Sequence, residues 1–177
     1  AFDPALVAPS LERPNPPFFH DATAIEGDVI ARILASGAAV VDLRGLRDRP
    51  SEAQEEAALA ALWDGADVVI APLLPRDREH HRSGRPSLLV KAADESGYVP
   101  VQIKFHRVLE SQPPDGPLLA VSSLGAIRVD TDAPLRRFRW GQRLNAALQV
   151  AHYWRLLEAT GFAAHHPRGG LVGLDQI

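Results

Sequence analysis

Residues 82–108, RSGRPSLLVKAADESGYVPVQIKFHRV, contain two apolar segments separated by a turn sequence. The first segment covers about 87–92, the second covers about 98–108, and Asp94-Glu95-Ser96-Gly97 lies between them. Segments rich in β-branched residues on either side of a short glycine-containing turn are typical of a β-hairpin. We therefore predict an antiparallel pair of strands here, and the rest of the chain has to pack around it.

Apolar residues elsewhere follow helical and strand spacing. Ile25, Val29 and Ile33 recur four residues apart and predict an amphipathic helix over about 22–36. Ser51 and Gln54 predict a capping box at the start of a second helix over 50–65. A third helix is expected over 141–160, with strands over 38–43, 67–74, 118–123 and 169–175. This order predicts the fold class α/β, with a mixed central β-sheet flanked by helices.

Composition limits the classes of site and location. The chain has 177 residues, a formal net charge of −3 and no cysteine, which excludes disulfides, thiolate metal sites and cysteine nucleophiles. No apolar run reaches the roughly 18–20 residues of a membrane helix, and the lack of cysteine fits a reducing, cytoplasmic location. The proline-rich residues 1–21 are expected to be an extended lead-in to one domain over 22–177. We expect that domain to belong to a longer chain.

Alternation in the second hairpin strand assigns its side chains to two faces. One set is expected to face the core: Val99, Val101, Ile103 and Phe105. The other set is expected to face outward: Tyr98, Gln102, Lys104 and His106. Ser87, at the start of the partner strand, is expected on the outward side as well. Two interpretations stay open, a site for phosphodiester chemistry built around Lys104 and the polar face of an ordinary hairpin.

Three segments, in order, resemble a known family. GRPSLLVKA…GYVPVQIKFHR is similar to the GRPDLLV…YVPVDVKHH pattern of RecB-like nucleases in the PD-(D/E)XK superfamily. AIEGDVIARIL is similar to the helix that supplies an early glutamate, here Glu26, and ALQVAHYWRLLEATG to the downstream Q-x-x-x-Y helix, here Gln149 and Tyr153. The similarity runs from about residue 22 to 175. It implies a restriction-endonuclease-like fold and a Mg²⁺- or Mn²⁺-dependent DNA exonuclease or DNA-repair factor.

The resemblance also implies a role for each matched residue. Glu26, Ser87 and Gln102 would hold the metal ion, Lys104 would position the attacking water, and Gln149 and Tyr153 would orient DNA or the Lys104 strand. We expect Glu26 and Gln149 to converge on Lys104. However, Ser87 and Gln102 stand where the family has acids. The electrostatic binding energy that a divalent cation loses with two carboxylates is far larger than the binding energy that two neutral oxygens supply. A weak metal-dependent nuclease and a pseudo-nuclease that binds DNA or a protein therefore both stay open.

A basic segment precedes the third helix. PLRRFRWGQR, residues 134–143, interleaves arginines with aromatic residues, and its candidate DNA-binding residues are Arg136, Arg137, Arg139, Trp140 and Arg143. Arginines contact phosphates and aromatic rings stack on bases, which suits single-stranded DNA or DNA ends. The alternative is a charged loop with its aromatic residues in the core. The pairs His80-His81 and His165-His166 are expected to be solvated loop residues rather than metal ligands.

Overall fold

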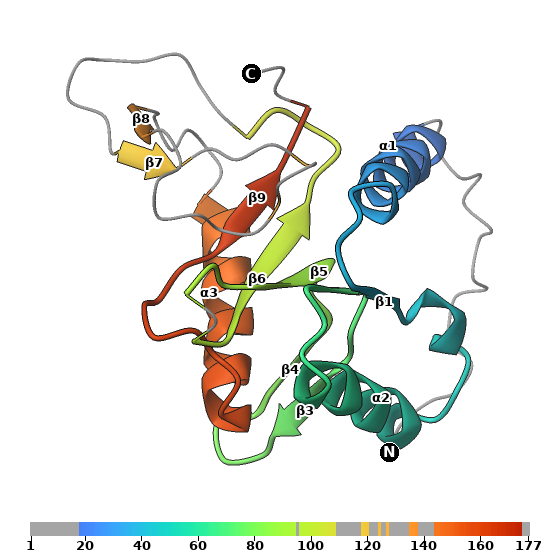
Figure 1. The fold of residues 1–177 in the computed structure, drawn as a ribbon, viewed down its shortest axis with the longest axis vertical. Coiled ribbons are helices and arrows are strands. Elements are labelled where there is room, and N and C mark those ends of the chain that lie inside the picture. The colour runs from blue at the N-terminus through green and yellow to red at the C-terminus, as the bar shows by residue number, and fades with distance from the viewer. Residues whose placement is uncertain are drawn as a thin grey trace, which may run out of the picture.

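The computed structural model describes residues 18–94, 96–108, 118–120, 124, 127, 135–137 and 144–174. Within these ranges the helices are α1 (Phe18–Leu34), η2 (a 3₁₀ helix, Arg44–Leu46), α2 (Ser51–Trp63) and α3 (Leu144–Thr160). The strands are β1 (Val40–Asp42), β2 (Val68–Ile70), β3 (Leu74–Asp77), β4 (Arg82–Gly84), β5 (Leu88–Lys91), β6 (Tyr98–Ile103), β7 (Leu118–Ala120), β8 (Leu135–Arg137) and β9 (Gly170–Val172) (Figure 1).

Five strands form a mixed sheet in the order β1-β2-β5-β6-β9. β1 runs parallel to β2, β5 is antiparallel to both of its neighbours, and β9 runs parallel to β6. The predicted hairpin is therefore the centre of the sheet, and the predicted α/β class with a mixed sheet is confirmed. We call the end where β1, β2, β6 and β9 finish and β5 begins the carboxyl end of the sheet.

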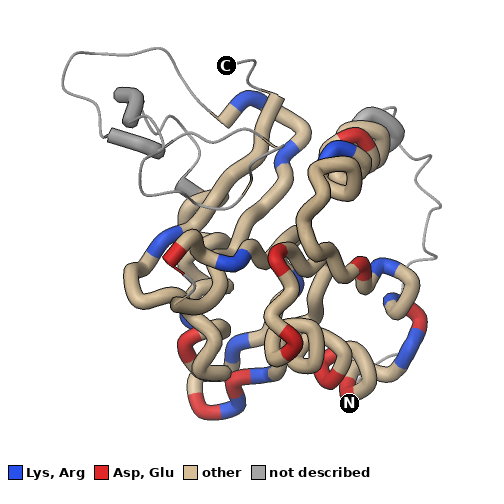
Figure 2. The backbone as a smooth tube through the Cα atoms, viewed as in Figure 1, with Lys and Arg blue, Asp and Glu red and all other residues tan. Residues whose placement is uncertain are grey.

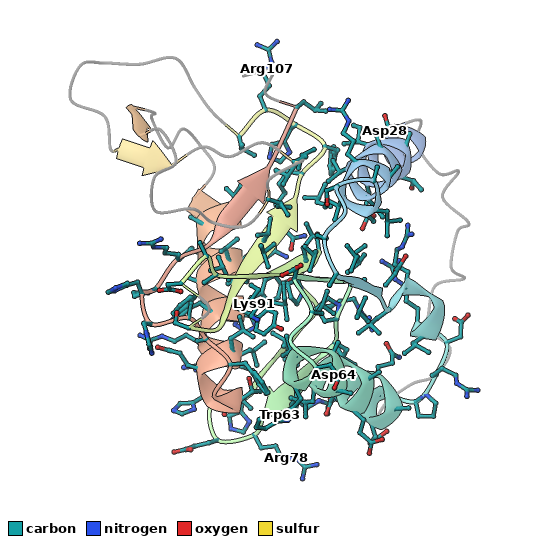
Figure 3. The ribbon with its side chains drawn as sticks, viewed as in Figure 1. Asp28, Trp63, Asp64, Arg78, Lys91 and Arg107 are labelled. Carbon is teal, nitrogen blue, oxygen red and sulfur yellow. The ribbon has the colours of Figure 1, made fainter. Side chains whose placement is uncertain are left out.

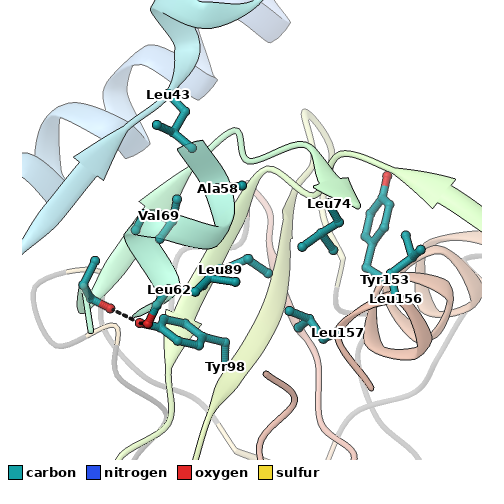
Figure 4. Packing of buried hydrophobic residues seen from close by; sticks show 12 residues of the cluster. Leu43, Ala58, Leu62, Val69, Leu74, Leu89, Tyr98, Tyr153, Leu156 and Leu157 are labelled. Atoms are coloured by element: carbon teal, nitrogen blue, oxygen red, sulfur yellow. Dashed lines mark hydrogen bonds between the residues drawn. The ribbon is translucent and has the colours of Figure 1, made fainter. Parts of the chain in front are cut away.

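Helices cover both faces of this sheet. On one face, Ile30 and Ile33 of α1 belong to a buried cluster with Leu88 of β5. On the other face, α2 and α3 pack against Leu89, the next residue along β5, in the cluster that Figure 4 shows. Because successive strand residues point to opposite faces, α1 lies on the face opposite α2 and α3. The core therefore has two layers, one on each side of the sheet.

Several predicted boundaries differ from the structure. α1 begins at Phe18, inside the stretch predicted as lead-in, while residues 1–17 lie outside the described ones. Part of the segment predicted as a loop forms the β3–β4 hairpin, which pairs with a register shift. That hairpin packs on α3, and β4 ends at Gly84, where an added Cβ atom would lie 2.5 Å from the ring of Tyr153. The polar sequence of this hairpin carries no pattern typical of a strand. The hairpin is stabilised by packing on α3, which a local sequence pattern does not show.

The predicted capping box is wrong. The residue before α2 is Pro50, and no side chain caps the first turn. Gln54 is instead buried, with 6% of its surface exposed, and its amide donates to the carbonyl oxygens of Arg47 at 3.2 Å and Arg49 at 2.6 Å. Gln54 therefore supplies two hydrogen bonds to the segment between η2 and α2 rather than to the first turn of its own helix.

The predicted division of this strand into an outward and a core-facing set is wrong in two places. Tyr98 is buried, and its hydroxyl lies 2.9 Å from the carbonyl oxygen of Ala66 and 3.2 Å from that of Leu62, at the end of α2 (Figure 4). Phe105 lies beyond the end of β6 and is 55% exposed. The strand is covered by helices on both faces, so polar and apolar alternation does not decide which residues meet solvent. No helix in the described ranges is both long and apolar enough to cross a membrane.

Candidate functional site

Lys104 lies at the carboxyl end of the sheet, directly after β6. Its backbone N–H donates to the carbonyl oxygen of Val172 at 2.8 Å, so pairing with β9 continues through this residue. Alternation along β6 places its side chain on the face that α3 covers. There the half-buried ammonium donates to Oε1 of Gln149, with 2.7 Å between Nζ and the oxygen.

Gln149 and Tyr153 lie one turn apart on α3 and extend this contact. Nε2 of Gln149 donates to the hydroxyl oxygen of Tyr153 at 2.9 Å. The ammonium of Lys104 has no acceptor atom, so it fixes which end of the Gln149 amide faces it. The buried Tyr153 ring packs against Gly84, where no side chain larger than hydrogen fits without a shift. Lys104, Gln149 and Tyr153 thus form one ordered chain of hydrogen bonds.

No carboxylate neutralises Lys104 within the part of the chain that the structure describes. The ion pairs there join Asp42 to Arg44, Asp77 to both His80 and Arg82, and Glu158 to Arg155. Burial lowers the pKa of Lys104, because desolvation disfavours the charged form. Gln149 therefore positions the ammonium without neutralising its charge.

Ser87 and Gln102 lie opposite each other at the open end of the β5–β6 hairpin. The backbone N–H of Ser87 donates to Oε1 of Gln102 at 3.3 Å, and Oγ of Ser87 accepts from the backbone N–H of Ile103 at 3.1 Å. Both candidate metal-binding oxygens are thus neutral and already accept hydrogen bonds. Magnesium and manganese are held mainly by carboxylates. The described residues contain no group of three or more histidine, aspartate or glutamate side chains that would hold an ion. This donor set does not fit the divalent metal that the resemblance implies.

The convergence of Glu26 on Lys104 stays a prediction. It lies on α1, whose buried residues pack against the face opposite α3. Its charge interacts with that of Arg44, the first residue of η2, and within the described ranges no hydrogen bond or ion pair joins it to Ser87, Gln102 or Lys104. Gln149 reaches Lys104 as expected.

The remaining candidates are placed only in part. Arg136 and Arg137 belong to β8, which pairs with β7. Arg139, Trp140 and Arg143 lie outside the described residues. Among the histidines, His80 is exposed at the β3–β4 turn, and its Nδ1 lies 3.0 Å from Oδ2 of the buried Asp77.

Arg85 was missed from the sequence. It is half-buried, and its guanidinium donates to the carbonyl oxygen of Ala71 at 2.9 Å and to Oε1 of Gln54. Arg85 lies in the segment between β4 and β5, and its bond to Gln54 of α2 assigns its side chain to the face that α2 and α3 cover. Its partners lie 14 and 31 residues away in the chain, so no local sequence pattern signals these contacts.

Comparisons with protein-family models, curated proteins and solved structures found no match.

Proposed function

We propose that this protein is a nuclease-like DNA-binding module, a pseudo-nuclease that holds the phosphate backbone through Lys104 without a catalytic metal ion. The observation that carries the proposal is the ammonium of Lys104, held at 2.7 Å by the neutral amide of Gln149 and paired with no carboxylate of the described residues. A phosphodiester supplies the negative charge that this environment lacks.

The chemistry of lysine suits this role. An ammonium has three N–H donors, and among the described residues Lys104 bonds through one of them, to Gln149, which leaves donors for a phosphate oxygen. The Gln149–Tyr153 contact holds the long side chain in place, which reduces the ordering cost that a free lysine pays when it binds. Support also comes from the resemblance, since these three residues match the lysine and the Q-x-x-x-Y helix of the RecB-like pattern.

The metal-dependent nuclease that the resemblance also implies finds less support. It requires anionic ligands near Lys104, whereas Ser87 and Gln102 offer neutral oxygens that accept backbone hydrogen bonds. Glu26, the remaining acid of the matched positions, belongs to the helix on the opposite face. DNA cleavage is therefore not part of the proposed function, and an experiment has to exclude it.

The test measures DNA affinity against salt concentration in EDTA for the unaltered chain and for Lys104→Gln. Loss of one charged hydrogen bond of roughly 1.5 kcal/mol weakens binding about tenfold. Loss of one phosphate contact also lowers the slope of log K against log salt by about 0.7–0.9. The chain has two lysines, so Lys91→Gln is the matched control and should bind like the unaltered chain. Equal affinity of Lys104→Gln and the unaltered chain would overturn the proposal.

A further inference from the structure

Arg85 is held at the carboxyl end of the sheet in the same way as Lys104. Its guanidinium donates to Oε1 of Gln54, while the amide nitrogen of Gln54 is fixed by the carbonyl oxygens of Arg47 and Arg49. A second bond, at 2.9 Å, joins Arg85 to the carbonyl oxygen of Ala71. Each cation is therefore positioned by a glutamine from a helix, Gln149 of α3 for Lys104 and Gln54 of α2 for Arg85.

The hairpin relates the two cations to each other. Arg85 lies three residues before β5 and Lys104 lies directly after β6, so both lie at the open end of the β5–β6 hairpin. Arg85 bonds to Gln54 of α2 and Lys104 bonds to Gln149 of α3, so both belong to the face of the sheet that these two helices cover.

The charge around Arg85 also favours an anion. No ion pair joins it to a carboxylate in the described ranges. Burial and the nearby positive charge of Arg47 lower the pKa of the Arg85 guanidinium. The guanidinium of an arginine has five N–H groups, and Arg85 uses two of them on acceptors of the described residues. Figure 2 shows many of the acidic residues on α2 and at the β3–β4 turn, whereas the charged residues in the described segment 104–108 are Lys104 and Arg107.

We propose that Lys104 and Arg85 form a two-cation clamp that binds two phosphates of one DNA strand. Both cations are oriented by neutral glutamine side chains, so the phosphates of a bound DNA strand supply the negative charges that neutralise them. This inference rests on the proposed function and adds to it a second contact residue and the requirement that the ligand carry more than one phosphate.

The experiment repeats the salt titration in EDTA with Arg85→Gln, with Arg85→Lys and with the double variant Lys104→Gln/Arg85→Gln. Arg85→Gln should weaken DNA binding about tenfold and lower the salt slope by about 0.7–0.9, and the double variant should lower it by about twice as much. Arg78→Gln, an exposed arginine that Figure 3 shows at the lower end of the molecule, is the control and should leave the slope unchanged.

Arg85 also holds backbone groups, so folding of each variant is checked by circular dichroism. If Arg85→Gln does not fold, Arg85→Lys tests the clamp instead, because this variant keeps the positive charge but loses the planar arrangement of N–H donors. The clamp predicts several-fold weaker binding with an unchanged slope, and affinity equal to that of the unaltered chain overturns it. If Lys104→Gln weakens binding but the Arg85 variants do not, the clamp fails and the proposed function stands. If Lys104→Gln has no effect, the proposed function fails.

Discussion

Replacing Gln149 by glutamate would neutralise Lys104 without removing it. The two side chains have the same shape, and Oε1 of Gln149 already lies 2.7 Å from Nζ of Lys104. The bond that the amide of Gln149 donates to Tyr153 is lost, but a hydrogen bond between the two residues remains, because the hydroxyl of Tyr153 then donates to the new carboxylate. We expect Gln149→Glu to fold and to keep the geometry of the chain, with a negative charge directly beside the ammonium.

The expected energies separate stability from binding. Two opposite charges about 4 Å apart near a protein surface attract by about 4 kcal/mol in a medium of intermediate polarity. Solvent screening around the half-buried Lys104 reduces the net gain to about 1 kcal/mol or less. Gln149→Glu should therefore unfold at slightly higher urea concentration, while its DNA affinity falls about tenfold, as in Lys104→Gln. A variant that is more stable and yet binds worse identifies the free charge as the binding group.

The pKa of Lys104 gives an independent measurement. With two lysines in the chain, ¹³C methylation of the amines gives two lysine signals that are assigned with the Lys91→Gln control. Burial lowers the pKa of Lys104 in the unaltered chain, and the added carboxylate should raise it in Gln149→Glu. If Gln149→Glu raises this pKa but binds DNA as tightly as the unaltered chain, the charge of Lys104 does not hold phosphate and the reasoning is refuted.

Three further predictions concern the elements around the site. Tyr98→Phe should lower the free energy of unfolding by about 1–2 kcal/mol in urea, because buried carbonyl groups at the end of α2 lose a donor, and an unchanged midpoint would contradict this. Gly84→Ala should cost about 1–3 kcal/mol and weaken DNA binding, because the new methyl group displaces the ring of Tyr153; full affinity would show that this ring does not position the site. Ser87→Asp with Gln102→Asp should destabilise the hairpin by roughly 1 kcal/mol without metal, and added Mg²⁺ should then raise its melting temperature more than that of the unaltered chain. Equal shifts would show that the acids do not create a metal site.

Local patterns predicted the parts of the structure that depend on local spacing. Two apolar segments around a glycine-containing turn predicted the β5–β6 hairpin, and strand alternation predicted that Gln102 and Lys104 share a face. The four-residue spacing of Gln149 and Tyr153 predicted that they lie together on one side of a helix. Each of these relations follows from the geometry of a single strand or helix.

Relations between elements were not predictable in this way. Gln54 fits a capping pattern, yet it is buried and bonds to the loop after η2 because α2 turns that side toward Arg85. Tyr98 matches the polar set of an alternating strand, yet α2 covers it. Glu26 lies on a correctly predicted helix, but packing decided that α1 covers the face opposite α3. For Gln54 and Tyr98, tertiary burial outweighs local pattern.

The most direct test follows end-labelled DNA with the unaltered chain, in EDTA and again with Mg²⁺ or Mn²⁺, and records binding and cleavage in the same samples. Neutral side chains at Ser87 and Gln102, together with a Lys104 ammonium that bonds to the neutral amide of Gln149, predict that binding persists in EDTA, weakens with salt and leaves the DNA intact with either metal. Binding that requires a divalent metal, together with cleavage that disappears in Lys104→Ala, would contradict the proposal and show an active nuclease.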